Sequence, residues 1–152
     1  MRTYLSSVAL VVLLLGSACS SGASIEGAGT SPLEGRWQMV SFSWNGSDQA
    51  VELDGNTAVV PFVEFGEDVS GNAGCNNFGD NSTVGYDYTN GSLTFDDMVM
   101  DASECNSGLM ETEMALSKAL FADVPIEVTI DSDSMTWTLE GHTYEFERSA
   151  GG

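Results

Sequence analysis

Three cysteines are the side chains of this sequence with the clearest capacity for covalent chemistry. Cys19 follows the small residues 16–18, directly after an apolar run from Val8 to Leu15. Cys75 and Cys105 stand well inside the remaining chain. Exported proteins meet an oxidising compartment, so an intramolecular disulfide between Cys75 and Cys105 is the economical interpretation. In the chain-entropy picture a loop of this length contributes roughly 3 to 4 kcal/mol.

Two other uses of Cys75 and Cys105 remain open. A structural zinc ion needs four ligands, and the chain offers these two thiols and one histidine, His142. A redox-active pair usually has the C-x-x-C spacing, which is absent here. We therefore favour the disulfide and predict no metal site.

Groups that could perform catalysis are few. His142 lies next to a predicted turn, where a lone histidine is usually an exposed or hydrogen-bonded polar residue. The sequence has no G-x-S-x-G motif, so a serine nucleophile is not indicated. The 23 acids are too many for any pair to stand out as glycosidase carboxylates. We predict no enzyme activity and no cofactor.

Two polar stretches could bind a ligand instead. The glycines of the segment 71–79 would let the backbone approach a ligand closely, but with Asn76 and Asn77 they favour a turn and bulge that position Cys75. Asp131-Ser132-Asp133 invites a calcium interpretation, yet the glycine and terminal glutamate of an EF-hand loop are missing. A solvated hairpin turn is favoured for this second stretch.

The amino terminus indicates export. Arg2 precedes the apolar run, which is too short to span a bilayer, so residues 1–18 are predicted to be a signal peptide. The small residues before Cys19 resemble a lipobox, which favours a lipid on Cys19 and a membrane-anchored protein facing the periplasm or the cell exterior. Cleavage near Ala18 or Ala23, with Cys19 lost or left free, is the alternative. Residues 19–32 are predicted to be the lipidated cysteine and a flexible tether.

Net charge narrows the range of partners. The chain carries −19 at pH 7, and loss of Arg2 with the signal leaves three basic and 23 acidic side chains. Nucleic acids and anionic lipid headgroups both require Lys or Arg to neutralise phosphate, so a nucleic-acid role is excluded. The acids are scattered rather than grouped, which favours a solvated acidic surface suited to a salty habitat over specific divalent-cation sites.

The remaining residues, 33–148, suit one domain with one core. Alternating apolar residues predict strands over most of this length, with a change of phase near Val40 and a further strand at 58–65. Asn90-Gly91 and Glu140-Gly141 predict tight hairpins. Residues 107–122 have the spacing of a single amphipathic helix, followed by Pro125. We predict a mostly β (α+β) domain, an antiparallel barrel-like sheet with one helix.

Several motifs along this domain resemble the META/HslJ-like family. Residues 33–37 resemble its L-x-G-x-W opening, and Phe65 with residues 69–76 resembles its F…V-S-G-x-x-G-C-N signature. A second cysteine before the helix and a final strand ending in Arg148 follow in order, although residues 101–104 depart from the threonine and alanine common in the family. The matching motif residues are Gly35, Trp37, Phe65, Gly71, Gly74, Cys75 and Asn76.

This resemblance implies a small barrel-like domain of bacterial envelope proteins, associated with stress and without a settled activity. We therefore expect a non-catalytic, lipid-anchored envelope protein that interacts with another envelope protein. The alternative is a binding module that takes an apolar ligand into the barrel interior, between Trp37, Phe65, Trp137 and Phe146. The number of aromatic residues favours a packed interior, because a barrel of about eight strands is only just wide enough for its own side chains or one small ligand.

Overall fold

The structure is a computed structural model that describes residues 31–44, 46–51, 59–79, 83–104 and 107–149. Residues 1–30 lie outside the described residues, so the predicted signal peptide, Cys19 and most of the tether do too. The elements of the described part are β1 (Gly35–Trp44), β2 (Ser47–Ala50), β3 (Phe62–Phe65), β4 (Val69–Asn72), β5 (Asn77–Phe78), β6 (Tyr86–Thr89), β7 (Ser92–Phe95), α1 (Ser107–Leu120), β8 (Ile126–Asp131), β9 (Ser134–Leu139) and β10 (His142–Arg148).

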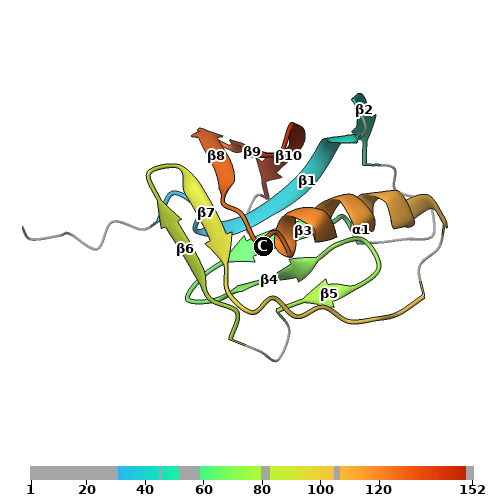
Figure 1. Cartoon of the computed structure of the whole chain (residues 1–152), viewed down its shortest axis with the longest axis horizontal. Coiled ribbons are helices and arrows are strands. Elements are labelled where there is room, and N and C mark those ends of the chain that lie inside the picture. The colour runs from blue at the N-terminus through green and yellow to red at the C-terminus, as the bar shows by residue number, and fades with distance from the viewer. Residues whose placement is uncertain (1–30, 45, 52–58, 80–82, 105–106, 150–152) are drawn as a thin grey trace, which may run out of the picture.

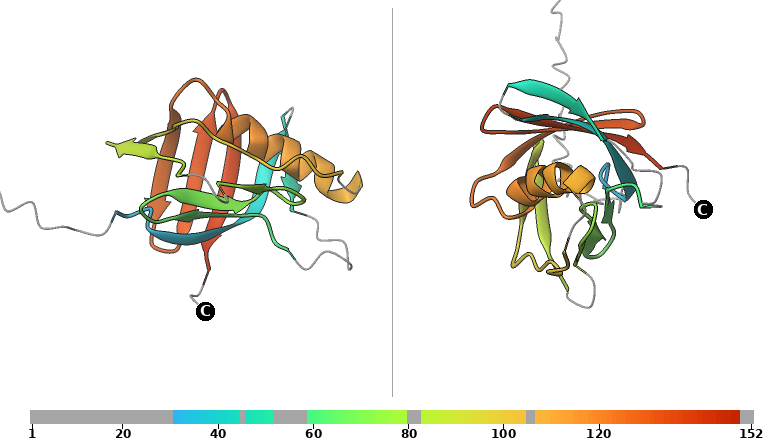
Figure 2. Two further views of the ribbon diagram at one scale, coloured as in Figure 1. Left: turned by 90° about the horizontal axis from the view of Figure 1, so that it is seen from below. Right: turned by 90° about the vertical axis from the view of Figure 1, so that its right-hand side faces the viewer.

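The described strands form one antiparallel sheet in the order β5-β4-β3-β1-β10-β9-β8-β7-β6, with β2 paired to β1 outside this path. The sheet curls into a half-barrel, and α1 lies in its concave side, between β8–β10 and β3–β7 (Figures 1 and 2). The predicted fold class is therefore confirmed. A curled sheet of this kind leaves one open side, which the helix closes.

β1 is the strand that joins the two halves of the sheet. Its first half pairs with β3, its second half pairs with β2, and its other edge pairs with β10. The register with β10 shifts between Met39 and Ser41, so Trp37 and Met39 face the core before the shift and Phe42 after it. The bulge predicted near Val40 is confirmed, and it lets one long strand bend with the sheet.

Tight turns connect the strands of the second half. Asn90 and Gly91 both have positive φ, at 55° and 80°, between β6 and β7. Glu140 and Gly141 repeat this geometry, at 50° and 82°, between β9 and β10. Both hairpins agree with the prediction from the dipeptides. Asparagine and glycine tolerate the positive φ that the right-handed twist of a hairpin requires, and in the second hairpin Glu140 adopts it ahead of Gly141.

The helix ends two residues earlier than the sequence predicted, at Leu120 rather than residue 122. Its inner face buries Leu109, Leu116 and Leu120 against the sheet. The side chains of Met110 and Met114 face outward, with 46% and 52% of their surface exposed. No helix in the described part of the chain is long and apolar enough to cross a membrane.

β4 and β5 are strands that the sequence analysis interpreted as a turn and bulge. Gly71 of β4 lies so close to its neighbours that an added Cβ atom would stand 2.2 Å from the carbonyl oxygen of Phe62 and 2.4 Å from the ring of Phe78. Glycine is required here because Phe78 packs directly over the backbone of β4. The strand predicted at 58–65 is also shorter, since β3 begins at Phe62, directly after Pro61.

One buried polar group stands out in the core. Tyr144 of β10 is fully buried, and its hydroxyl has no hydrogen-bond partner among the described residues. Burial, with a smaller contribution from the negative charge of Glu140, raises the pKa of Tyr144 to about 12. The folded protein therefore holds this hydroxyl in its neutral form at a pH where an exposed tyrosine ionises.

Replacing Tyr144 with Phe should leave the protein as stable at neutral pH, or more stable by about 1 kcal/mol, because a buried group without a partner is costly. Above pH 10 the unfolded chain ionises Tyr144 while the folded protein does not, up to about 12. The wild type should therefore lose stability over this interval relative to Tyr144→Phe. Urea unfolding of both proteins at neutral and alkaline pH measures the difference. A variant clearly less stable at neutral pH would mean that the hydroxyl has a partner.

Candidate functional site

The signature turn, residues 74–76, is held by the carboxylate of Glu113 from α1. The backbone N–H groups of Cys75 and Asn76 donate to Glu113 Oε2, at 3.2 and 3.1 Å. The side-chain amide of Asn76 donates to Glu113 Oε1 at 2.8 Å. One carboxylate thus receives three hydrogen bonds, and bonds to an ionised acceptor are among the stronger ones in proteins.

Asn76 also fastens the segment that leads to the helix. Its Oδ1 accepts a hydrogen bond from the backbone N–H of Ser103 at 2.7 Å, and its Nδ2 donates to the Ser103 carbonyl oxygen at 3.2 Å. Only 4% of Asn76 is exposed, and its amide is fully used by these contacts and the one with Glu113. Asn76 is therefore a structural joint between the turn, the helix and residue 103.

The turn requires a residue at position 74 that tolerates a positive φ. Gly74 has φ of 128°, and a Cβ atom at this position would approach the backbone of Leu109 in α1 to 3.5 Å. The Asn72 side chain stabilises the same bend, because its Oδ1 accepts a hydrogen bond from the Gly74 N–H at 2.8 Å. The sequence analysis favoured a turn that positions Cys75 over a ligand cradle, and these contacts within the chain occupy the backbone donors of the turn.

Cys75 is partly buried at the start of this joint. Cys105, its predicted partner, lies outside the described residues, so the pairing stays a prediction. Among the described residues, no group of three or more His, Cys, Asp or Glu side chains is placed to hold a metal ion.

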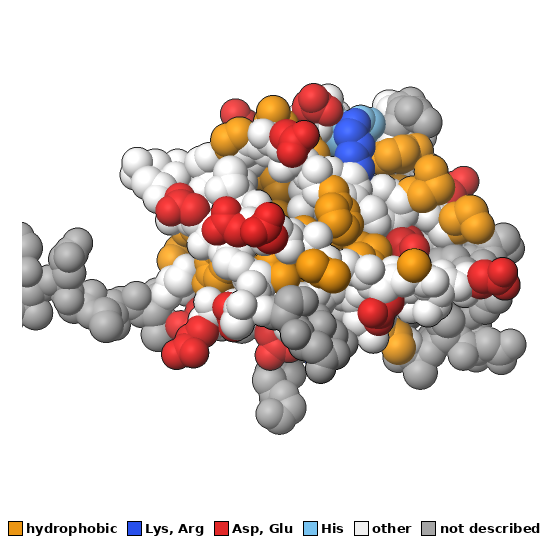
Figure 3. Space-filling model, turned by 60° about the horizontal axis from the view of Figure 1, so that its bottom comes forward, with side chains coloured by type: hydrophobic (Ala, Val, Ile, Leu, Met, Phe, Trp, Pro, Cys, Tyr) orange, Lys and Arg blue, Asp and Glu red, His pale blue; other side chains and the backbone are white. Residues whose placement is uncertain are grey.

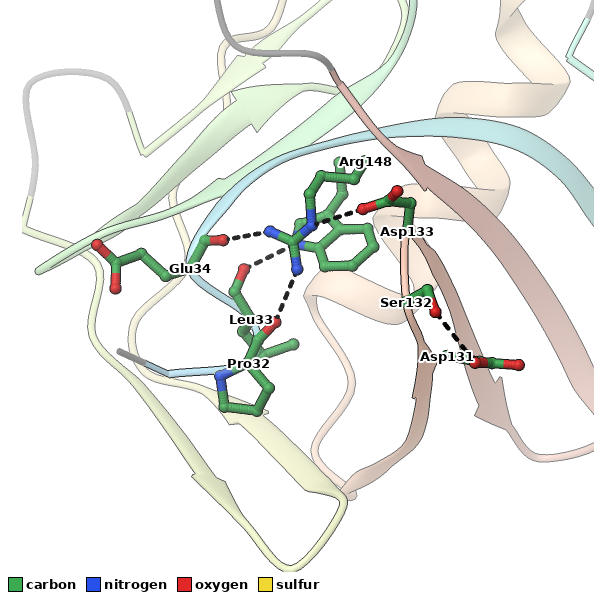
Figure 4. Close-up of polar contacts among 8 residues, drawn as sticks. Pro32, Leu33, Glu34, Asp131, Ser132, Asp133 and Arg148 are labelled. Carbon is green, nitrogen blue, oxygen red and sulfur yellow. Dashed lines mark hydrogen bonds and ion pairs between the residues drawn. The ribbon is translucent and has the colours of Figure 1, made fainter. Parts of the chain in front are cut away.

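A second joint brings Gly35 and Trp37 together with Arg148. Figure 4 shows Arg148 reaching the segment of Pro32 and Glu34. The guanidinium of Arg148 lies over the Trp37 ring, 4.0 Å from its centre, and donates to the carbonyl oxygens of Glu34 at 2.6 Å and Pro32 at 3.2 Å. The Trp37 indole N–H donates to the Leu33 carbonyl oxygen at 2.7 Å. The opening and closing segments of the domain are thereby fixed to each other.

The hairpin turn predicted at residues 131–133 connects β8, whose last residue is Asp131, to β9. Asp133 approaches Arg148 Nε at 3.5 Å, whereas Asp131 is contacted by the hydroxyl of Ser132 at 3.5 Å (Figure 4). Asp133 is exposed, so its ion pair with Arg148 adds little stability.

His142 stands at the start of β10 and contacts the edge of β1. Its Nδ1 lies 3.2 Å from the Ser43 carbonyl oxygen, and its ring is 5.2 Å from that of Trp44. Lys118 of α1 lies 5.8 Å above the Trp44 ring and pairs with Glu140 at 3.5 Å. These contacts are those of a partly buried, hydrogen-bonded histidine beside an aromatic ring.

The barrel interior is occupied by aromatic rings at the place proposed for an apolar ligand. Trp37, Phe65, Trp137 and Phe146 are each at most 1% exposed. The Trp137 ring lies 4.6 Å from Phe146, 5.8 Å from Phe95 and 6.4 Å from Phe65, centre to centre. Rings at these distances are in contact, so they pack the interior against one another.

The structure gives the predicted motif residues separate roles. Gly74, Cys75 and Asn76 form the joint with Glu113, and Gly71 leaves room for the Phe78 ring over β4. Gly35 and Trp37 meet Arg148 at the other joint. Phe65 belongs to the core. No local signal in the sequence identified Glu113 as the acceptor that holds the turn.

Comparisons with known proteins agree with this arrangement. A family model described as META domain matches residues 31–151. No curated protein matches the chain. An NMR structure of a protein from Burkholderia xenovorans is similar in fold, with a TM-score of 0.62 and 18% identity over 99% of this chain and 100% of that one. A further NMR structure has a TM-score of 0.57 and 25% identity, covering 78% of this chain and 94% of that chain.

Replacing Glu113 with Ala should lower the free energy of unfolding by about 2 to 4 kcal/mol, because it leaves two backbone N–H groups and the Asn76 amide without their acceptor. Glu113→Gln should lower the free energy of unfolding by less than Glu113→Ala, because the amide oxygen still accepts part of these hydrogen bonds. Glu111→Ala is the matched control: Glu111 is exposed on the same helix and should change stability by less than about 0.5 kcal/mol. Chemical denaturation measures all three, and equal losses for Glu111 and Glu113 would contradict the assignment.

Proposed function

The chain belongs to the META domain family, and from this premise we propose that it is a non-catalytic, lipid-anchored envelope protein that acts by binding another envelope protein. The observation that carries the proposal is the use made of the family signature. Gly74, Cys75 and Asn76 form a joint whose polar groups bond to Glu113 and Ser103. Because these signature residues stabilise the fold, we assign the function to other residues on the surface.

Packing of the interior weighs against the alternative of an apolar ligand inside the barrel. The rings around Trp137 contact one another, and a ligand at that place would have to displace them. Close-packed cores resist the insertion of extra atoms. A surface interaction is therefore the better supported of the two functions.

The described start of the domain suits a tethered protein. Arg148 holds the carbonyl groups of Pro32 and Glu34, so the chain enters the domain at a fixed point. Residues 19–32 would connect this point to a lipid on Cys19. An acidic domain held in this way would stand clear of anionic headgroups, which its charge of −19 repels.

The disulfide proposal is supported by the contacts of Asn76. Asn76 follows Cys75 directly and forms two hydrogen bonds with the backbone of Ser103, two residues before Cys105. Asn76 and Ser103, one and two residues from the two cysteines in the sequence, are therefore in direct contact. A covalent link here would reinforce the joint formed by Glu113.

Cys75→Ser and Cys105→Ser should each lower the free energy of unfolding by roughly 2 to 5 kcal/mol, and the double variant should lose no more than either alone. Both replacements remove the same bond, which is why their effects should not add. Denaturation of the unreduced proteins measures the losses, and thiol titration of the unreduced wild type should find neither Cys75 nor Cys105 reactive. Two reactive thiols in freshly exported protein would contradict the pairing.

Cys19→Ser should release the protein from the membrane fraction without changing its unfolding free energy, because Cys19 precedes the folded domain. Mass spectrometry of the wild type should find a diacylglyceryl group on Cys19. A wild-type chain that is unmodified and fully soluble would contradict the anchor.

The wild type and Cys19→Ser also test the proposed interaction with a partner protein. The chain has 23 carboxylates and one lysine, Lys118, so carbodiimide coupling in intact cells should join its acids to the amines of a partner. We expect a discrete adduct of higher mass with the wild type, and much less of it with Cys19→Ser. A chain that yields no adduct at the membrane would argue against the proposed function.

A further inference from the structure

An apolar stripe runs along the outer side of α1. Met110, Met114 and Phe121 are separated by four and seven residues, so they lie on one side of the helix. They are 46%, 52% and 50% exposed. Phe121 extends the stripe beyond the last residue of α1, because its N–H still donates to the Ser117 carbonyl oxygen at 3.0 Å.

The segment before the helix widens this surface. Met98 and Met100 are partly exposed, and Val99 between them is 53% exposed. The Ser117 hydroxyl lies 3.6 Å from Met100 Sδ, which places the segment beside α1. We call Met98, Met100, Met110, Met114 and Phe121 the methionine face, and Figure 3 shows hydrophobic side chains gathered across this side of the molecule with acids around them.

A hollow of about 270 Å³ lies at one end of the methionine face. Its apolar wall includes Met98, Leu120 and Phe121, and its acidic side chains are Asp97 and Asp123, both exposed. No cation lines it among the described residues. Lys118, the basic residue of α1, pairs with Glu140 and the Trp44 ring instead.

The net charge of the chain restricts which partners can bind the methionine face. A second copy of the chain would bring another −19 against it, and anionic lipid headgroups would be repelled in the same way. A partner with basic groups beside apolar ones is attracted by Asp97 and Asp123 and also buries the methionine face. Methionine side chains adapt to the shape of what they bind, which suits such a surface.

We infer that the methionine face is the docking site for a basic, amphipathic segment of a partner protein. Its apolar side chains cover Met110, Met114 and Phe121, and a Lys or Arg enters the hollow between Asp97 and Asp123, where the Phe121 ring can also receive the cation. The inference rests on the proposed function and gives that interaction a surface and a chemistry.

Peptide binding to the mature chain tests the inference. The probe is an amphipathic helix of about 15 leucine and lysine residues, long enough to fold on contact. Its controls are a scrambled isomer without an apolar face and a version with glutamate in place of lysine. We expect saturable binding of the first peptide alone, weaker at high salt because screening shortens the reach of the charges. Equal binding of all three peptides, or of none, would overturn the inference.

Matched variants locate the site. Phe121→Ser and the pair Asp97→Asn with Asp123→Asn should each weaken binding by roughly tenfold, the loss typical of a central contact residue. Asparagine suits residue 97 because its φ is 42°, which asparagine tolerates. Val59→Ser and Asp131→Asn are the controls, since both alter exposed residues outside the methionine face and the hollow. Equal affinity of all variants would overturn the proposed location.

Photocrosslinking in the producing cells separates this inference from the proposed function. A photoreactive residue at position 114 should capture a partner protein, and one at position 131 should not. Capture at 131 alone would overturn the docking site and leave the proposed function standing. Capture at neither position, together with no carbodiimide adduct, would contradict both. Capture of a second copy or of lipid at 114 would also overturn the inference.

Discussion

The carboxylate of Glu113 connects parts of the chain that the sheet alone does not hold together. It accepts hydrogen bonds from the turn at Cys75 and Asn76, and Asn76 in turn holds Ser103. Glu113 thus links the helix to the turn, and Asn76 links the turn to the segment before the helix, which also pairs with β5 at Met100. Because α1 closes the open side of the curled sheet, the position of the helix over the core depends on this joint (Figure 2).

Arg148 and Trp37 hold the first and last segments of the domain together. A guanidinium is suited to this task because it can lie over an indole ring and donate to carbonyl groups in its plane at the same time. Arg148 does both, and it fixes the point where the chain enters the domain. The two joints account for every motif residue except Gly71, which leaves room for the Phe78 ring, and Phe65, which belongs to the core.

Most of the acidic surface and the methionine face have different physical meanings. Scattered acids on a domain of charge −19 keep copies apart and need no partner to be stable in water. Exposing methionine and phenylalanine side chains to water is unfavourable, and a contiguous apolar patch on a soluble protein marks an interaction site. Helical spacing alone predicted an amphipathic helix, but its outward face is less polar than that pattern implies.

The sequence by itself determined the strand periodicity, the bulge near Val40, both hairpins and the helix, because these depend on local spacing and turn chemistry. It also indicated the fold class and the family through motifs along the chain. It did not identify β4 and β5, since Gly71 of β4 serves the close approach of Phe78 from β5. Only the tertiary structure decided that Glu113 holds the signature turn and that the segment with Met98 and Met100 lies beside the outer side of α1. These are contacts between residues far apart in the chain, and local pattern carries no information about them.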